Sequence, residues 1–346
     1  MHKLTPPLFF LLERSVSQSD RIVSLDVLKC FSIFGVCWAH GIQHLTTADC
    51  VENPLYRWIY SFHMPLFMMV SGYFSVKSMK SSFWPFVGKK LKQIALPGFM
   101  WPWIYMLIGV AAWGGSIHLL NKNFTEYIPF WFLWSLLICN LLAYLGGKFK
   151  YGRIVTLVIS QGIQFANVIY MYPAFVLGQI VAENKDIVKS NLKKILLISA
   201  LVYFVSLLFW DANDWHLFSQ VQERISSEGY VSAGLFYVGK TVYKLLVNLS
   251  GALFFFSLFT FAEPLWNNGF GSFLGFVGKY TLIVYILQSF IIEMQLPKHV
   301  NLDCLSWPVF NLVVTPAISI GVMLFSVAVA DLVDKNRYTR LLLLGR

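Results

Sequence analysis

The stretch LDVLKCFSIFGVCWAHGIQHL, residues 25–45, decides the fold class of this chain. It is 21 residues long and mostly apolar. A helix of about 20 residues rises about 30 Å, which is the thickness of the hydrocarbon core of a bilayer. The stretch also contains four ionisable groups, Asp26, Lys29, His40 and His44. Ionisable groups are costly inside a membrane and are usually functional there. The pattern therefore predicts a transmembrane helix with a polar working face.

The composition extends this prediction to the whole chain. Hydrophobic residues make up 57% of the 346 residues and charged residues 13%, whereas a soluble protein has about 45–50% apolar and about 25% charged residues. Too little charge is present to cover a water-facing surface, so we expect an all-α, polytopic membrane helical bundle with about ten transmembrane helices. The expected spans are 27–45, 57–76, 93–113, 127–146, 153–168, 169–183, 195–210, 233–262, 277–295 and 306–332. A turn at Asn167 separates the fifth span from the sixth.

The net charge of +10 is distributed asymmetrically. With ten spans, 19 of the 27 Lys and Arg residues fall on the side of both termini, and four fall in the loops of the other side. Basic residues concentrate in cytoplasmic loops, so this split predicts cytoplasmic termini. The chain then divides into a cytoplasmic tail (1–20), a transmembrane domain (21–335) and a second cytoplasmic tail (336–346). The lysines are scattered over separate loops without interleaved stacking aromatics, which argues against binding of nucleic acid.

Lys29 and His40 share one face of the first predicted helix. They are eleven residues apart, which at 100° per residue leaves a difference of about 20° and an axial separation of about 16 Å. Asp26 lies one turn before Lys29 and is placed to hold it. In the simpler alternative Lys29 extends to the membrane interface and His40 is a hydrogen-bonded core residue.

Three other spans also carry polar or small residues. In the second span Pro65 follows His63 and predicts a kink, and Ser71 with Gly72 allows a neighbouring helix or a ligand to approach the backbone. In the eighth span Lys240, Lys244 and Asn248 form a polar stripe, suited to an anionic ligand or to lipid headgroups. The ninth span contains Gln288 and Glu293.

Six segments, taken in order, resemble the membrane acyltransferase-3 family. They are R-x3-LD-x2-K-x10-H (Arg21 to His40), SFHMPLFMMVSGYF (61–74), FVGKKLKQIALP (86–97), PFWFLWSLL (129–137), YPAFVLGQ (172–179) and GKYTLIVYILQ (278–288). Members of this family are polytopic enzymes of the bacterial cytoplasmic (inner) membrane. They transfer an acyl group, usually acetyl from acetyl-CoA, to sugars of surface or exported glycans.

The resemblance assigns roles by position. His40 matches the essential histidine of the family and Lys29 its basic partner, Lys89 and Lys90 match a pair of basic residues, and Ser71 with Gly72 matches a Ser-Gly pair of the second span. We therefore expect His40 and Lys29 to be catalytic. The physical reading adds Lys92 to Lys89 and Lys90 as cations that meet the CoA donor, and no metal is expected. Substrate binding is expected at the polar and aromatic residues of the spans, Asp26, His63, Ser71, Trp131, Lys240 and Lys244. Two departures stand out. Gln288 occupies a position where the family often has histidine, and lysine replaces arginine at the basic sites, which keeps the charge and loses bidentate phosphate binding.

Chemistry supports this assignment and leaves alternatives open. Cations on the inner side suit the phosphates of CoA, and a neutral His40 suits a general base or the nucleophile that forms an acyl-histidine. The expected partners are an acyl-CoA donor, a glycan or lipid-linked sugar acceptor, and membrane lipid. The main alternative is a transporter or flippase for an anionic or glycan-lipid substrate. A third is a non-catalytic partner of a polysaccharide synthase.

Overall fold

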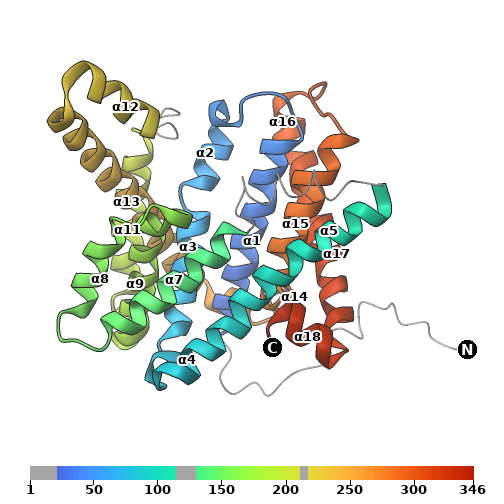
Figure 1. The fold of residues 1–346 in the computed structure, drawn as a ribbon, viewed down its shortest axis with the longest axis horizontal. Helices are drawn as coiled ribbons and strands as arrows, with labels where there is room; N and C mark the ends of the chain where they lie inside the picture. Colours follow the sequence, from blue (N-terminus) through green and yellow to red (C-terminus); the bar gives the residue numbers. More distant parts are fainter. Residues whose placement is uncertain (1–21, 114–129, 211–216) are drawn as a thin grey trace, which may run out of the picture.

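The computed structural model describes residues 22–113, 130–210 and 217–346, and the regular elements within these ranges are helical (Figure 1). Three π-helical turns interrupt or extend the helices at Leu91–Ala95, Ser289–Gln295 and Phe310–Val314. The helices are α1 (Val23–His44), α2 (Pro54–Tyr60), α3 (His63–Ser75), α4 (Phe83–Lys90), α5 (Leu96–Trp113), α7 (Trp131–Gly146), α8 (Gly152–Ser160), α9 (Val168–Glu183), α10 (Lys185–Ser190), α11 (Leu192–Leu207), α12 (Leu217–Glu228), α13 (Tyr230–Phe261), α14 (Gly269–Lys279), α15 (Thr281–Gln288), α16 (Trp307–Val309), α17 (Thr315–Asp334) and α18 (Arg337–Leu344).

The all-helical prediction is confirmed for the described part of the chain. Four stretches there are long and apolar enough to cross a membrane: Val23–His44, Phe165–Glu183, Tyr230–Phe261 and Trp307–Asp334. A fifth is the pair Gly269–Lys279 and Thr281–Lys298, which is bent by 63° at its break. The count of ten spans and the cytoplasmic side of both termini stay predictions, and the predicted tail 1–20 lies outside the described residues.

The outward faces of α11 and α13 are apolar. Leu197, Ile198 and Leu201 on α11 are more than 60% exposed, and Val231 and Leu235 on α13 are more than 70% exposed. Contiguous apolar surface of this kind is unfavourable in water and is typical of helices that face lipid or a partner. The exposed surface therefore agrees with the composition in favouring a membrane bundle.

Helix α1 is the central element of the bundle. It contacts α2, α3, α13, α14, α15 and α17, and Figure 1 shows it between α3 and the α14–α15–α17 group. Leu28, Cys37 and Ile42 are fully buried, as expected for a helix surrounded by others. At Gly278 the backbone of α14 comes so close to α1 that an added Cβ would lie 2.0 Å from the carbonyl oxygen of Asp26. The position of α1 is thus fixed from several sides.

Glycines bring α3 and α9 into direct backbone contact. A Cβ at Gly72 would lie 1.9 Å from the carbonyl oxygen of Phe175, and a Cβ at Gly178 would lie 1.8 Å from that of Met69. Small residues permit this close approach, which is a main source of helix association in membranes. Of the two uses predicted for the Ser71–Gly72 seam, Gly72 therefore serves helix packing.

The second expected span is interrupted just before Pro65. Helix α2 ends at Tyr60, and α3 begins at His63. Proline has no N–H to donate to the carbonyl four residues earlier, and its ring collides with that carbonyl, which for Pro65 belongs to Ser61. The interruption at Ser61 and Phe62 therefore lies where the predicted effect of Pro65 falls, and Pro65 itself lies in the first turn of α3.

The turn predicted at Asn167 is confirmed, because Ala166 and Asn167 both adopt left-handed backbone conformations just before α9. Helix α8 has nine residues, about 14 Å of helix, so 153–168 does not cross as one continuous helix. Residues 230–261, in contrast, form an unbroken helix of 32 residues.

We expect Gly178→Ala to lower the stability of the bundle by roughly 1–3 kcal/mol, because the new methyl group forces α3 and α9 apart. Thermal unfolding of purified protein in detergent measures the effect. The matched control is Gly239→Ala on α13, where an added Cβ meets nothing within 4 Å. Equal unfolding midpoints for the two variants would contradict the packing role of Gly178.

Candidate active site

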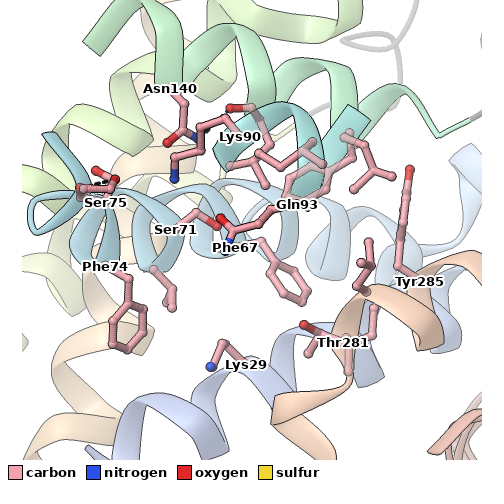
Figure 2. A pocket seen from close by; sticks show the side chains of 18 of the residues that line it. Lys29, Phe67, Ser71, Phe74, Ser75, Lys90, Gln93, Asn140, Thr281 and Tyr285 are labelled. Carbon is pink, nitrogen blue, oxygen red and sulfur yellow. Dashed lines mark hydrogen bonds between the residues drawn. The ribbon is translucent and has the colours of Figure 1, made fainter. Parts of the chain in front are cut away.

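A cavity of about 500 Å³ lies among α1, α3, α7, α15 and the turn that joins α4 to α5 (Figure 2). Its wall is apolar over most of its area, with Ile33, Val36, Phe67 and Leu133 among the contributors. Polar groups enter this wall at a few positions, which is typical of sites that bind small molecules. The cavity lining includes four lysines, Lys29, Lys77, Lys89 and Lys90.

Lys29 is held at the cavity by two neighbours. Its Nζ lies 2.6 Å from Asp26 Oδ1 and 5.2 Å from the centre of the Phe74 ring. The predicted Asp26–Lys29 pair is therefore present. Asp26 itself is not among the residues that line the cavity, so its contact with Lys29 makes it a positioning residue.

Lys90 is the more buried of the paired lysines at the end of α4. Its Nζ lies 5.7 Å from the centre of the Phe86 ring. Burial and the neighbouring Lys89 cation lower the pKa of the Lys90 ammonium to about 8. A cation in this state gains from an anionic partner, because the partner offsets both desolvation and the repulsion from Lys89.

Uncharged polar groups complete the cavity. Asn140 on α7 donates from Nδ2 to the carbonyl oxygen of Leu136 at 2.8 Å. Its Oδ1 atom is buried and has no hydrogen-bond partner among the described residues. Ser71 and Gln93 also line the wall, and both are drawn in Figure 2. A buried acceptor without a donor is costly, so Asn140 Oδ1 is suited to a ligand N–H group.

The working face of α1 continues from the cavity to His40. Lys29, Ile33 and Val36 line the cavity, and His40 follows Val36 by one helical turn on the same face. Because α1 is unbroken from Val23 to His44, the sequence prediction that Lys29 and His40 face the same way is confirmed. His40 itself lies beyond the residues that line the cavity.

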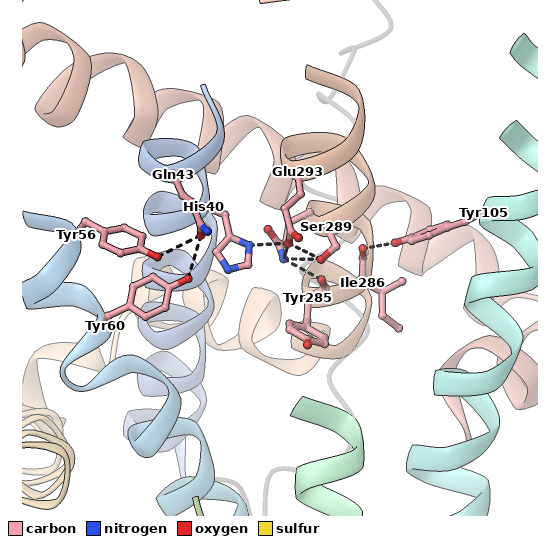
Figure 3. A network of polar contacts seen from close by, with 10 residues as sticks. His40, Gln43, Tyr56, Tyr60, Tyr105, Tyr285, Ile286, Ser289 and Glu293 are labelled. Carbon is pink, nitrogen blue, oxygen red and sulfur yellow. Dashed lines mark hydrogen bonds and ion pairs between the residues drawn. The ribbon is translucent and has the colours of Figure 1, made fainter. Parts of the chain in front are cut away.

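His40 is paired with Glu293. Its Nδ1 atom lies 2.6 Å from Glu293 Oε1 (Figure 3). The same carboxylate oxygen accepts hydrogen bonds from Ser289 Oγ and from Gln288 Nε2, the latter at 3.1 Å. The side chains of His40 and Glu293 are 18% and 26% exposed, so both are reachable from solvent.

Glu293 is the functional residue that the sequence analysis did not assign to the site. In an α-helix, residues five apart such as Gln288 and Glu293 point about 140° away from each other. Ser289–Gln295 forms a π-helical turn, whose hydrogen bonds join residues five apart. The π turn therefore directs both side chains to one point. The sequence offered one signal for Glu293, which is an acidic residue within an expected span.

The pair has the geometry of an oriented general base. With Nδ1–H donated to Glu293, the neutral imidazole presents Nε2 as its proton acceptor, and the carboxylate stabilises the ring once Nε2 is protonated. Gln288, which stands where histidine is frequent in the resembling family, donates to this carboxylate and adds no second base.

Sequence comparison identifies the family to which this architecture corresponds. A family profile described as an acyltransferase domain matches residues 22–332, which is most of the chain. The chain belongs to the acyltransferase-3 family. The curated proteins similar to it include the nodulation protein NolL of Sinorhizobium fredii, 28% identical over 187 residues, which are 49% of this chain and 51% of that protein. NolL of Mesorhizobium japonicum is 29% identical over 184 residues, 48% and 49% of the respective chains.

The chain thus spans about half the length of these curated relatives. No solved structure matches it.

Several residues that the sequence analysis assigns to the site lie elsewhere. Lys92, Trp131 and His63 are not among the residues that line the cavity. Lys92 is exposed, because at 100° per residue it lies off the helix face on which Lys89, Lys90, Gln93 and Ile94 line the cavity. His63 is buried, with its Nδ1 donating to the carbonyl oxygen of Ile59 at 2.7 Å.

Lys240 and Lys244 are also remote from this cavity of the acyltransferase-3 fold. Their Nζ atoms lie 6.0 Å from the centre of the Phe236 ring and 5.6 Å from that of Tyr170. The structure therefore brings Lys29, Ser71, Lys89 and Lys90 together at the cavity. His40 lies on α1 one helical turn beyond Val36, the last residue of α1 that lines the cavity. Lys240 and Lys244 of α13 lie outside the site.

The end of the acyltransferase-3 chain packs against the cavity wall. Helix α18 lies in the predicted tail 336–346 and contacts α5, and Trp101 Nε1 donates to the carbonyl oxygen of Leu343 at 3.1 Å. Gly345 has a left-handed backbone, and an added Cβ would lie 2.5 Å from the carbonyl oxygen of Lys92 and 2.7 Å from Gln93 Cα. Gly345 thus fits directly against the π turn that carries Gln93.

We expect Gly345→Ala to loosen the turn at 91–95, because the methyl group collides with its backbone and the residue must also keep a positive φ. Hydrogen exchange followed by mass spectrometry should show faster exchange of the amides in this turn. Gly229→Ala is the matched control, since it has a φ of 88° and open space around its Cα. Unchanged exchange at 91–95 in Gly345→Ala would contradict the contact.

Proposed function

We propose that this acyltransferase-3 protein is an integral-membrane O-acyltransferase. It transfers an acetyl group from cytoplasmic acetyl-CoA to a hydroxyl of a cell-surface or exported polysaccharide. One observation carries the proposal. The His40–Glu293 pair, with Nδ1 and Oε1 2.6 Å apart, stands on the same face of α1 as the lysine-lined cavity.

The residues of the cavity fit the chemistry of CoA. Its nucleotide end carries several negative charges, for which Lys29, Lys89 and Lys90 supply cations, and Lys90 in particular is stabilised by an anion. Its pantetheine arm is long and thin and contains amide N–H groups, for which the unpartnered Asn140 Oδ1 is a buried acceptor. The apolar wall formed by Ile33, Val36 and Phe67 suits the rest of the arm.

His40 acts as the general base in this proposal. The acceptor hydroxyl oxygen attacks the thioester carbonyl carbon while His40 Nε2 takes the hydroxyl proton. The carbon–sulfur bond then breaks, and the proton passes from His40 to the departing thiolate, so the products are an acetyl ester and free CoA. Glu293 keeps Nδ1 protonated and stabilises the transient imidazolium, which makes it a positioning residue for this step.

We expect His40→Ala to lower the transfer rate about 100-fold or more, because the reaction loses its base. Glu293→Gln should lower kcat by a comparable factor and leave the KM for the donor unchanged, with partial recovery in Glu293→Asp. Radiolabelled acetyl transfer to host glycan in proteoliposomes measures both quantities. His299→Ala, an exposed loop histidine, is the control.

Transfer that persists in His40→Ala at normal protein level would refute the catalytic role. Movement of glycan-lipid across the vesicle membrane without acetylation would instead favour the transporter alternative.

The donor affinity should depend on pH through Lys90. The free ammonium has a pKa of about 8, and a bound phosphate raises this value, so binding takes up a proton when the pH is above 8. The Kd should therefore rise about twofold between pH 7 and 8 and up to about tenfold per pH unit above pH 8. Calorimetry with a non-hydrolysable CoA thioether measures this Kd.

Two substitutions test the assignment to Lys90. Lys90→Arg should bind with a Kd independent of pH in this range, because guanidinium stays protonated, whereas Lys90→Gln should bind weakly at every pH. A wild-type Kd that does not change from pH 7 to 9.5 would contradict the role of Lys90.

A further inference from the structure

A second polar cluster borders His40 on the side of α1 that faces α2. Gln43 follows His40 by three residues, about 60° around the helix. Its side-chain oxygen Oε1 accepts a hydrogen bond from Tyr56 OH at 3.3 Å and another from Tyr60 OH at 3.2 Å. Figure 3 shows the two tyrosines and Gln43 on one side of His40, with Glu293 on the other.

The two phenols fix the orientation of the Gln43 amide. With Oε1 occupied by two O–H donors, the Nε2 group carries the remaining donor capacity of the side chain. None of the described residues accepts a hydrogen bond from Gln43 Nε2, and Gln43 is half-buried, so a ligand can reach this N–H group. An oriented amide donor thus stands beside the catalytic imidazole.

Aromatic rings form the rest of the cluster. The rings of Tyr56 and Tyr60 have centroids 4.2 Å apart. The Tyr60 ring packs edge-on against His63 at 4.7 Å, and His63 is itself anchored to the backbone at Ile59. His63, which sequence reasoning assigned to the substrate, therefore supports Tyr60 from behind.

The chemistry of this cluster differs from that of the cavity. The cavity supplies lysines for an anion, whereas Gln43 supplies an uncharged amide and the half-buried Tyr60 an aromatic ring. Tyr56 is buried and acts on the amide alone. Neutral hydrogen-bonding groups next to aromatic rings suit a neutral polyol, whose hydroxyls accept from an amide and whose C–H groups pack on rings. The cluster also adjoins His40, where the acceptor hydroxyl must lie if His40 takes its proton.

We propose that Gln43 and Tyr60, with the buried Tyr56 behind them, form the acceptor subsite and bind an uncharged sugar ring of the glycan beside His40. This inference rests on the proposed function and adds the residues that select the acceptor. Gln43 Nε2 donates to a sugar hydroxyl next to the one that is acylated. Tyr56 and Tyr60 hold the amide in place.

The experiment is acceptor kinetics in proteoliposomes, with labelled acetyl-CoA as donor and the glycan fraction of host cells that lack this protein as acceptor. Gln43→Leu removes the amide and should raise the apparent KM for glycan about tenfold, the usual effect of one hydrogen bond. Tyr60→Phe loses one of the two phenol contacts and should raise it a few-fold. In both variants kcat and the KM for acetyl-CoA should match the wild type.

Tyr243→Phe is the matched control, because its phenol donates to the backbone of Ser206 at 2.8 Å on the remote helix α13. An unchanged glycan KM in Gln43→Leu would overturn the subsite, as would a parallel rise in the KM for acetyl-CoA. Wild-type protein that binds acetyl-CoA but transfers acetyl to no glycan would instead refute the proposed function.

Discussion

The helical repeat of α1 is the constraint on which the proposed site depends. One unbroken helix places Lys29 and His40 on the same face with an axial separation of about 16 Å. A break or a shift of register between them would turn His40 away from the cavity and from Glu293. The surrounding helices, above all α14 at Gly278, hold α1 in position. Lys29 at the cavity and His40 therefore lie along one helix, and Glu293 reaches His40 from the π turn that follows α15.

Two π turns, which depart from regular α-helix, carry residues of the site that do not belong to α1. Gln93 and Ile94 of the π turn at 91–95 line the cavity, and the π turn at 289–295 brings Glu293 to His40. Such turns lose regular hydrogen bonding and persist where neighbouring structure supports them. Gly345 of the C-terminal segment packs on the π turn at 91–95. In the π turn at 289–295, Glu293 accepts hydrogen bonds from Ser289 and Gln288. The backbone of the bundle is thus regular at its centre and irregular where the proposed chemistry is located.

The sequence alone predicted the part of the site that follows from α-helical spacing. The shared face of Lys29 and His40, the Asp26–Lys29 pair and the turn at Asn167 are all confirmed. Glu293 was not assigned, because it reaches His40 through a π turn, whose extra residue per turn leaves no mark in the hydrophobic pattern. Lys92 was assigned by its charge, although it lies off the helix face of Lys89 and Lys90. The interruption at Ser61 and Phe62 follows from Pro65, because proline disrupts the helix four residues before it. Lys240 and Lys244 share a face as predicted, but periodicity within one helix cannot show which helices pack around the cavity.

In the proposed reaction His40, held by Glu293, promotes transfer of an acyl group to a glycan. Mass analysis of surface glycans tests it most directly, in cells that lack this protein and are complemented with the wild type, with His40→Gln or with Glu293→Gln at matched membrane levels. We expect glycan carrying an acetyl ester in wild-type cells, none in cells with His40→Gln, and a trace with Glu293→Gln. Glycans of identical mass in the presence and absence of the wild-type protein, or full acetylation with His40→Gln, would contradict it.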